Sequence, residues 1–207
     1  MIGFYNYSVI VTYIGVALSV SGMALASTGQ FKFAILCLAL AGACDTFDRK
    51  IARAMKNRTK EMEIFGIQID SLCDMVCFGV TPVIISYQMG LNSVWGIAIE
   101  ILFVLCGVIR LAYFNVLEEL KHTNPETDQA KGYRGLPITT ITIIYPIVYL
   151  FHPLVSHETF LLFLAIMHIV VAFLYVLDFK LKKPGNSIIA AMMVLVTAVM
   201  VCILFVE

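Results

Sequence analysis

The chain has 207 residues, of which 60% are hydrophobic and 14% are charged, and its mean hydropathy is +0.92. This composition excludes an ordinary soluble domain and indicates an integral membrane protein. Lysine and arginine total 14, as do aspartate and glutamate, so the net charge is zero and only the placement of charges along the chain is informative.

Apolar windows long enough to cross a bilayer, which takes about 20 residues, recur along the whole chain. We predict seven helices, with six or eight as alternatives: Asn6–Ser27, Phe31–Ala54, Phe65–Gln88, Val94–Leu117, Leu136–Phe151, Thr159–Leu177 and Ser187–Val206. The fifth is short and contains Pro146, so we expect it to be kinked, tilted or extended through His152. The first lacks a basic n-region and an A-x-A site, which favours a retained helix over a signal peptide. The prediction is an all-α, polytopic membrane bundle forming one domain over residues 1–207.

Basic residues concentrate in alternate connections between these helices. They surround the second, fourth and sixth connections: Arg49, Lys50, Arg53, Lys56, Arg58 and Lys60; Lys121, Lys131 and Arg134; Lys180, Lys182 and Lys183. Connections rich in lysine and arginine face the cytoplasm. We therefore predict a cytoplasmic N-terminus, cytoplasmic connections at Lys56–Phe65, Glu118–Leu136 and Asp178–Asn186, and, with seven helices, a C-terminus outside.

Four aspartates interrupt the second and third apolar windows. "DTFDRKIAR" holds Asp45 and Asp48, and "GIQIDSLCD" holds Asp70 and Asp74. Each helical residue advances about 100°, so the members of each pair share one helix face. The connection between the two helices is short, which makes them antiparallel neighbours. The four carboxylates should therefore meet in one cluster near the cytoplasmic end of the bundle.

Such a cluster is unfavourable unless its charge is neutralised. An aspartate at the centre of a membrane helix costs roughly 3 kcal/mol. Ion pairs with Arg49, Arg53 or Arg58 would account for two carboxylates at most and not for their common face. Divalent cations neutralise all four, and an all-oxygen ligand set suits Mg²⁺, Mn²⁺ or Ca²⁺ rather than zinc. Arginine beside a bound metal further indicates a phosphate ligand, for which the small residues Ala52 and Gly66 leave room.

The spacing of these residues resembles the signature of the CDP-alcohol phosphotransferase family, D-x-x-D-G-x-x-A-R…G-x-x-x-D-x-x-x-D. The matching positions, which span residues 45–74, are Asp45, Asp48, Ala52, Arg53, Gly66, Asp70 and Asp74. Two features depart from it. Arg49 replaces the first glycine, and the stretch between Arg53 and Gly66 is longer than usual. The first departure affects the placement of the cytidine, and neither alters the carboxylates.

Three later segments extend the resemblance to residues 45–139. "FGVTP" (Phe78–Pro82), "RLAYFN" (Arg110–Asn115) and "YRGLPIT" (Tyr133–Thr139) are similar to the phosphatidylserine synthase branch, in particular its archaeal and Gram-positive-type membrane enzymes. This resemblance implies transfer of a phosphatidyl group from CDP-diacylglycerol or CDP-archaeol to the hydroxyl of L-serine, with release of CMP. Inositol phosphate or glycerol phosphate remains an alternative acceptor. It also implies a homodimer in the cell membrane with a cytoplasmic active site, and no nucleic-acid partner.

The resemblance assigns roles to individual residues. Two divalent ions, Mg²⁺ or Mn²⁺ with Ca²⁺ as an alternative, would be held by Asp45, Asp48 and Asp70, with Asp74 near or on the second ion and acting as the general base. The CDP group would be bound by Arg53, Arg49, Ala52, Gly66, Asn6 and Thr12. The acceptor would be bound by Arg110, Asn115, Lys131 and Arg134. A structural pair with an acid remains an alternative for Arg110, and a polar position at the membrane interface remains an alternative for Asn6 and Thr12.

Two other classes of protein also fit intramembrane carboxylates. A UbiA-type prenyltransferase binds a diphosphate through aspartates and magnesium, but usually has more helices and a second aspartate motif. A divalent-cation transporter would use the carboxylates as an ion path, but often has an inverted repeat, and the second half of this chain has no matching acidic pair. Outside the cluster, we expect Glu100 to lie at the membrane interface and His168 to be a packing residue.

Overall fold

The computed structural model describes residues 7–54, 59–123, 133–181 and 185–205, with the backbone alone at positions that include 49–54 and 133–134. Its elements in chain order are α1 (Tyr7–Ser27), α2 (Phe31–Ala54), α3 (Lys60–Asp74), the π-helix η1 (Met75–Val80), α4 (Thr81–Gln88), α5 (Val94–Thr123), β1 (Tyr133–Arg134), the 3₁₀ turn η3 (Ile138–Thr140), α6 (Ile141–Tyr149), the 3₁₀ turn η4 (His152–Leu154), α7 (His157–Val176), β2 (Lys180–Leu181) and α8 (Asn186–Phe205).

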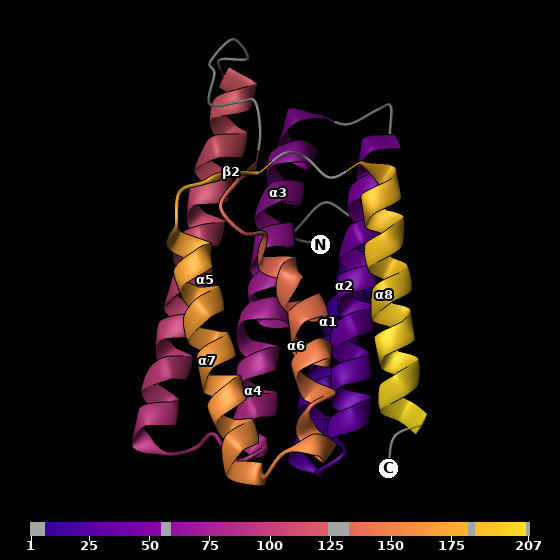
Figure 1. Cartoon of the computed structure of the whole chain (residues 1–207). Helices are drawn as coiled ribbons and strands as arrows, with labels where there is room; N and C mark the ends of the chain where they lie inside the picture. The colour runs from indigo at the N-terminus through magenta and orange to yellow at the C-terminus, as the bar shows by residue number, and fades with distance from the viewer. Residues whose placement is uncertain (1–6, 55–58, 124–132, 182–184, 206–207) are drawn as a thin grey trace.

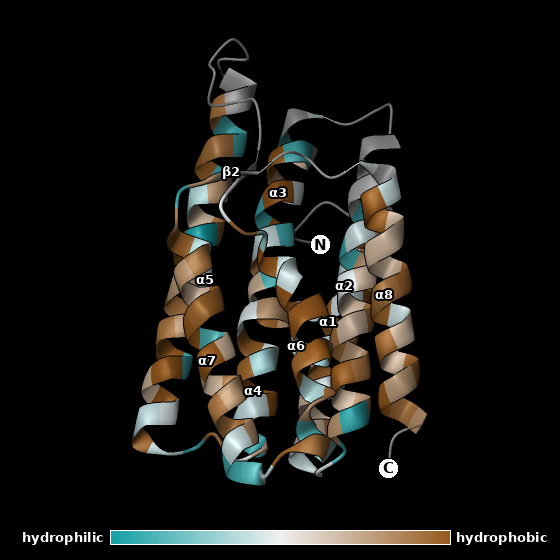
Figure 2. Ribbon diagram, viewed as in Figure 1, coloured by the Kyte–Doolittle hydropathy of each residue, from teal (hydrophilic) through white to brown (hydrophobic). Residues whose placement is uncertain are grey.

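The helices stand side by side as one bundle (Figure 1). Because α3, η1 and α4 follow one another without a break, the described residues form seven helical columns, as predicted. Five are long and apolar enough to cross a membrane: Val9–Ser27, Glu61–Gln88, Val94–Leu120, His157–Val176 and Ser187–Phe205. Helix α2 has the length, but its C-terminal half is charged. Apolar residues dominate the middle of the columns in Figure 2, so the protein is a multi-pass membrane protein.

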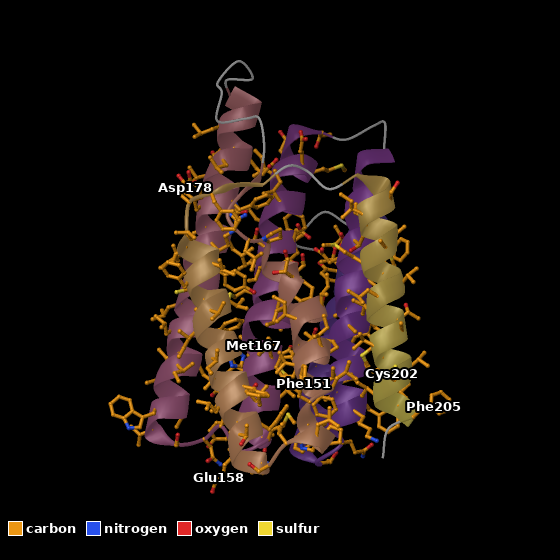
Figure 3. The ribbon with its side chains drawn as sticks, viewed as in Figure 1. Phe151, Glu158, Met167, Asp178, Cys202 and Phe205 are labelled. Atoms are coloured by element: carbon orange, nitrogen blue, oxygen red, sulfur yellow. The ribbon has the colours of Figure 1, made fainter. Side chains whose placement is uncertain are left out.

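The described helix ends and the strand that flank the basic connections lie at one end of the bundle. The C-terminal ends of α2 and α5, the N-terminal ends of α3 and α8, and strand β2 all lie at the end drawn uppermost in Figure 1. Figure 3 places Asp178 near this end, just after α7, and Glu158 at the opposite end of the same helix. The described chain therefore alternates between the two ends in the way that the charge pattern requires.

The fifth column is short and irregular, as Pro146 led us to expect. It is built from η3, the nine-residue α6 with Pro146 inside it, and then η4. The prediction that it extends through His152 is confirmed. This column packs closely on α2 at Gly42, three residues before Asp45. The contact leaves no room for a side chain there, since a Cβ added to Gly42 would lie only 2.5 Å from the Oγ1 of Thr142. Small residues allow such close helix contacts in membranes.

The π-helix η1 begins directly after Asp74 and ends two residues before Pro82. Pro82 has no N–H group, and its ring would collide with the carbonyl four residues earlier in a regular α-helix. The wider turn removes this conflict, and its carbonyl at Val76 accepts both the N–H and the side-chain hydroxyl of Thr81, the latter at 2.9 Å. Helices α3 and α4 therefore continue as one column, with the change of register at its middle. Such π segments occur frequently at functional sites.

Candidate functional site

Three carboxylates from two helices meet near the end of the bundle that carries the basic residues. Asp45 lies on α2, and Asp70 and Asp74 lie one turn apart on α3. One oxygen of each lies within 4.8 Å of the others. Asp45 and Asp74 are buried, with 6% and 5% of their surface exposed, and Asp70 is half-buried. Like charges this close in a dry site repel one another, and an oxygen-only set of this kind fits a hard divalent cation.

Asp48, the fourth carboxylate, lies one turn beyond Asp45 on α2 and is also buried, at 4% exposed. Its Oδ2 accepts a hydrogen bond of 2.7 Å from the Oγ1 of Thr12 on α1. The helix-face argument therefore placed Asp48 on the correct side of α2, but it lies outside the group of three. Thr12, which we expected near the cytidine, contacts this carboxylate in the structure. Helix α1 thus takes part in orienting the acidic site.

Helix α5 contributes two of the residues expected to bind the acceptor. Arg110 is 5% exposed, and its Nε–H donates to the carbonyl of Leu136 at 2.9 Å. The Oδ1 of Asn115 accepts from the Ser71 hydroxyl at 2.6 Å, and its amide donates to Gln68 at 3.3 Å. Ser71 directly follows Asp70 in the chain. Asn115 therefore ties α5 to the acidic segment of α3, whereas Arg110 ties it to the segment before α6.

The other expected substrate-binding residues are placed less completely. Gly66 is half-buried on α3, one turn before Asp70. The structure describes only the backbone of four further residues: Arg49, Ala52 and Arg53 in α2, and Arg134 in β1. Asn6 and Lys131 lie outside the described residues. The C-terminal end of α2 lies at the basic end of the bundle with strand β2 (Figure 1), to which β1 is paired.

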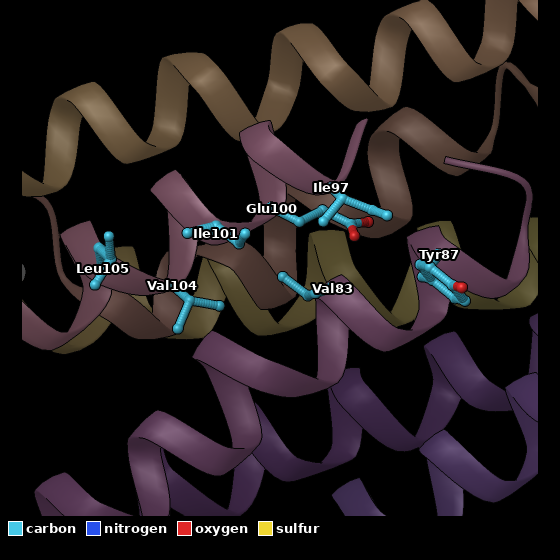
Figure 4. A pocket seen from close by; sticks show the side chains of 7 residues that line it. All are labelled: Val83, Tyr87, Ile97, Glu100, Ile101, Val104 and Leu105. Atoms are coloured by element: carbon cyan, nitrogen blue, oxygen red, sulfur yellow. The ribbon is translucent and has the colours of Figure 1, made fainter. Parts of the chain in front are cut away.

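A groove elsewhere on the bundle is separate from the acidic site. It has a volume of about 310 Å³ and is lined by Val83 and Tyr87 of α4, by Glu100, and by four aliphatic residues of α5 (Figure 4). Val83 lies nine residues beyond Asp74, or about 13 Å along a helix axis. Glu100 is only 4% exposed, and its Oε1 has no hydrogen-bond partner among the described residues. The location of Glu100 at the membrane interface stays a prediction, and the structure adds that its side chain is buried beside this groove.

His168 is a packing residue, as expected. It is fully buried on α7, and its ring lies edge-on to Phe103 of α5, with 4.7 Å between the ring centroids. The contact joins two membrane-length helices, so His168 belongs to the core of the bundle.

Comparison with known proteins identifies related sequences. The sequence model for CDP-alcohol phosphatidyltransferase matches residues 5–176. The chain is 38% identical over 112 residues to CDP-diacylglycerol–serine O-phosphatidyltransferase of Saccharomyces cerevisiae, covering 53% of this chain and 39% of the relative. It is 32% identical over 142 residues to the Helicobacter pylori protein of that name, covering 68% and 55%. It is 33% identical over 127 residues to archaetidylserine synthase of Methanothermobacter thermautotrophicus, covering 61% and 50%. The chain thus spans about half or less of the length of these relatives.

Proposed function

The chain belongs to the CDP-alcohol phosphatidyltransferase family, and on that premise we propose that it is a phosphatidylserine synthase: it transfers the phosphatidyl group of CDP-diacylglycerol, or of CDP-archaeol, to L-serine and releases CMP. The observation that carries this proposal is the meeting of Asp45, Asp70 and Asp74 within 4.8 Å, inside the segment that bears the family signature. Relatives from three organisms, whose names specify serine or archaetidylserine, support the choice of acceptor.

Asp45, Asp70 and Asp74 would hold the divalent ions, with Asp48 completing the set on α2. Two ions, Mg²⁺ or Mn²⁺ with Ca²⁺ as the alternative, fit the oxygen-only donors. When bound, such ions offset the negative charge of the diphosphate and of the departing CMP. The hydrogen bond from Thr12 fixes the orientation of the Asp48 carboxylate from α1.

Asp74 is the residue proposed to accept the proton of the serine hydroxyl. The serine oxygen forms a bond to the phosphorus that carries the lipid. The bond from this phosphorus to the bridging oxygen of the diphosphate breaks, and CMP leaves with that electron pair. A general base must lie within hydrogen-bond reach of the proton that it removes. Asp74 is buried and its oxygen lies within 4.8 Å of those of Asp45 and Asp70, so a hydroxyl held beside the metal would be within its reach.

The donor and acceptor have separate sets of proposed ligands. Arg53 and Arg49 would bind the diphosphate beside the small residues Ala52 and Gly66, with Asn6 near the cytidine. For the acceptor, Arg110 is the main candidate for the serine carboxylate, because a cation that is 5% exposed within a membrane helix requires an anionic partner. A guanidinium has five N–H donors in a fixed fork that matches a carboxylate, and its Nε–H donates to the carbonyl of Leu136. Asn115, Lys131 and Arg134 would complete this group.

An acceptor comparison tests the proposal directly. Purified protein is given CDP-diacylglycerol or CDP-archaeol with one acceptor at a time, and CMP release and the lipid product are measured. We expect product with L-serine and little with inositol phosphate or glycerol phosphate. Product from either phosphate, with none from serine, would overturn the acceptor assignment and leave the metal mechanism standing.

We further propose that the protein is a homodimer in the cell membrane, with its N-terminus and active site on the cytoplasmic side. The basic end of the bundle supports this orientation. Single cysteines at positions 178 and 158, near opposite ends of α7 (Figure 3), form a matched pair. In a cysteine-free protein that retains activity, an impermeant maleimide added outside intact cells should label position 158 and spare position 178. The reverse pattern would contradict the orientation.

A further inference from the structure

The segment at residues 135–138, between β1 and α6, is fixed to the end of α7 through its backbone. The N–H of Gly135 donates to the carbonyl of Phe179 at 2.8 Å, and the N–H of Leu136 donates to that of Leu174 at 3.4 Å. Just before this segment, β1 pairs with β2 in antiparallel register. Two connections that are far apart in the sequence are thereby joined at the basic end of the bundle.

Two buried side chains hold the carbonyl groups of the same segment. Arg110 of α5 donates to Leu136 at 2.9 Å, and the Tyr175 hydroxyl of α7 donates to Ile138 at 3.0 Å. Tyr175 is 2% exposed, so its hydroxyl depends on protein partners in place of water. The carbonyl groups bound by Arg110 and Tyr175 are two residues apart, and each bond comes from a different helix.

The segment has little space in which to shift. Gly135 has φ +72°, a backbone conformation that favours glycine. A Cβ at this position would lie 3.2 Å from the carbonyl oxygen of Leu177 and 3.7 Å from the Nε of Arg110. The backbone at Gly135 therefore passes directly beside the Arg110 guanidinium, which donates a hydrogen bond to the next residue, Leu136. A displacement of the segment would move the Leu136 carbonyl and with it the position of Arg110.

Tyr175 also lies close to the reacting end of the site. The Asp74 carboxylate and the Arg110 guanidinium are both within electrostatic range of its hydroxyl. The hydrogen bond between Tyr175 and Ile138 is therefore near both the proposed base and the proposed acceptor-binding arginine. A change in this bond should affect the acceptor side of the site before it affects the diphosphate side on α2.

We propose that Tyr175 is a positioning residue for acceptor binding. Its hydroxyl holds residues 135–138 in place, and this segment holds Arg110 through Leu136 in the orientation that receives the acceptor carboxylate. Without the hydroxyl, the carbonyl of Ile138 loses a donor and Arg110 loses a fixed anchor. The inference rests on the proposed function, because it takes Arg110 to be the acceptor ligand.

Tyr175→Phe tests this role, with Tyr145→Phe as its matched control. Each variant removes one buried hydroxyl; that of Tyr145, on α6, bonds the Ser86 side chain at 2.8 Å, away from the acidic site. For full-length protein in detergent, we expect Tyr175→Phe to raise the KM for serine by about 3- to 10-fold, the effect of one lost hydrogen bond. The KM for CDP-diacylglycerol should stay within about twofold of the wild-type value, since the lost hydrogen bond from Tyr175 to Ile138 does not involve α2, which holds the proposed diphosphate ligands. Hydrogen exchange in a peptide covering residues 133–138, measured without substrate, should become faster. Tyr145→Phe should show neither effect.

An unchanged KM for serine in Tyr175→Phe would overturn the positioning role, whether or not exchange becomes faster. Equal increases in both KM values, or the same increase in Tyr145→Phe, would also overturn it, because a general loss of structure would then explain the result. Failure of the proposed function looks different: wild-type protein would form no product from serine. If the wild-type protein uses another acceptor, the KM for that acceptor is compared between the wild type and the two variants. The same outcomes then support or overturn the positioning role of Tyr175.

Discussion

Replacing Asp45 or Asp70 by asparagine is expected to lower the rate of CMP release by roughly a thousandfold, the scale of losing a main electrostatic contact to the transition state. Asparagine keeps the shape of the side chain but removes the charge that a divalent cation requires. Their oxygens lie within 4.8 Å of each other and of Asp74, so each carboxylate should be needed for the same site. The rate is measured with L-serine at saturating Mg²⁺ or Mn²⁺.

The same variants should remain folded, which separates this effect from loss of structure. Removing one of several crowded negative charges relieves repulsion, so the metal-free variants should unfold at a temperature no lower than the wild type. The stabilisation that added metal gives the wild type should be lost, because binding to the folded state alone stabilises it. Asp178→Asn, which changes an exposed acid beyond α7, should match the wild type in both measurements. Near-normal activity of Asp45→Asn would refute the role of the cluster.

Asp74→Asn is expected to separate turnover from donor binding. If Asp74 takes the proton from the acceptor hydroxyl, its loss should lower kcat by about 10²- to 10⁴-fold, the usual contribution of a general base. Asp45, Asp48 and Asp70 would still hold metal and diphosphate, so the affinity for CDP-diacylglycerol should change far less. Asp70→Asn should weaken donor binding more strongly than Asp74→Asn does.

Equilibrium binding of the CDP-lipid and single-turnover rates, measured on the same preparations, provide this comparison. Near-normal turnover by Asp74→Asn would reject its role as base and leave the metal site untouched. An equal loss of donor affinity in Asp74→Asn and Asp70→Asn would assign Asp74 to metal binding alone.

The helices could be predicted from the sequence because each is specified by a local property. The apolar window Phe31–Ala54 coincides with α2, and the window that starts at Val94 starts α5 correctly. The extension of α5 to Thr123 was missed because its last turns are polar and lie beyond the apolar stretch. The β1–β2 pair was missed for a different reason: two-residue strands are too short to show alternation.

The site was predictable in composition more than in arrangement. Helical spacing places Asp45 and Asp48 on one face, but it does not fix how far α2 is offset along α3. That offset brings Asp45, and not Asp48, into the group with Asp70 and Asp74. The contact of Thr12 with Asp48 and that of Tyr175 with Ile138 join residues 36 and 37 positions apart. No local pattern marks such pairs, and the residues beside Tyr175 in α7 are apolar, so the sequence does not distinguish it from a packing residue.

The central claim is that a divalent metal held by Asp45, Asp70 and Asp74 supports transfer to serine. Its most direct test is CMP release from CDP-diacylglycerol and L-serine by purified protein stripped with EDTA and then titrated with Mg²⁺ or Mn²⁺. We predict no CMP from the stripped protein and recovery of the full rate on titration in the wild type, with no recovery in Asp45→Asn. Full activity of the stripped wild-type protein would contradict the claim.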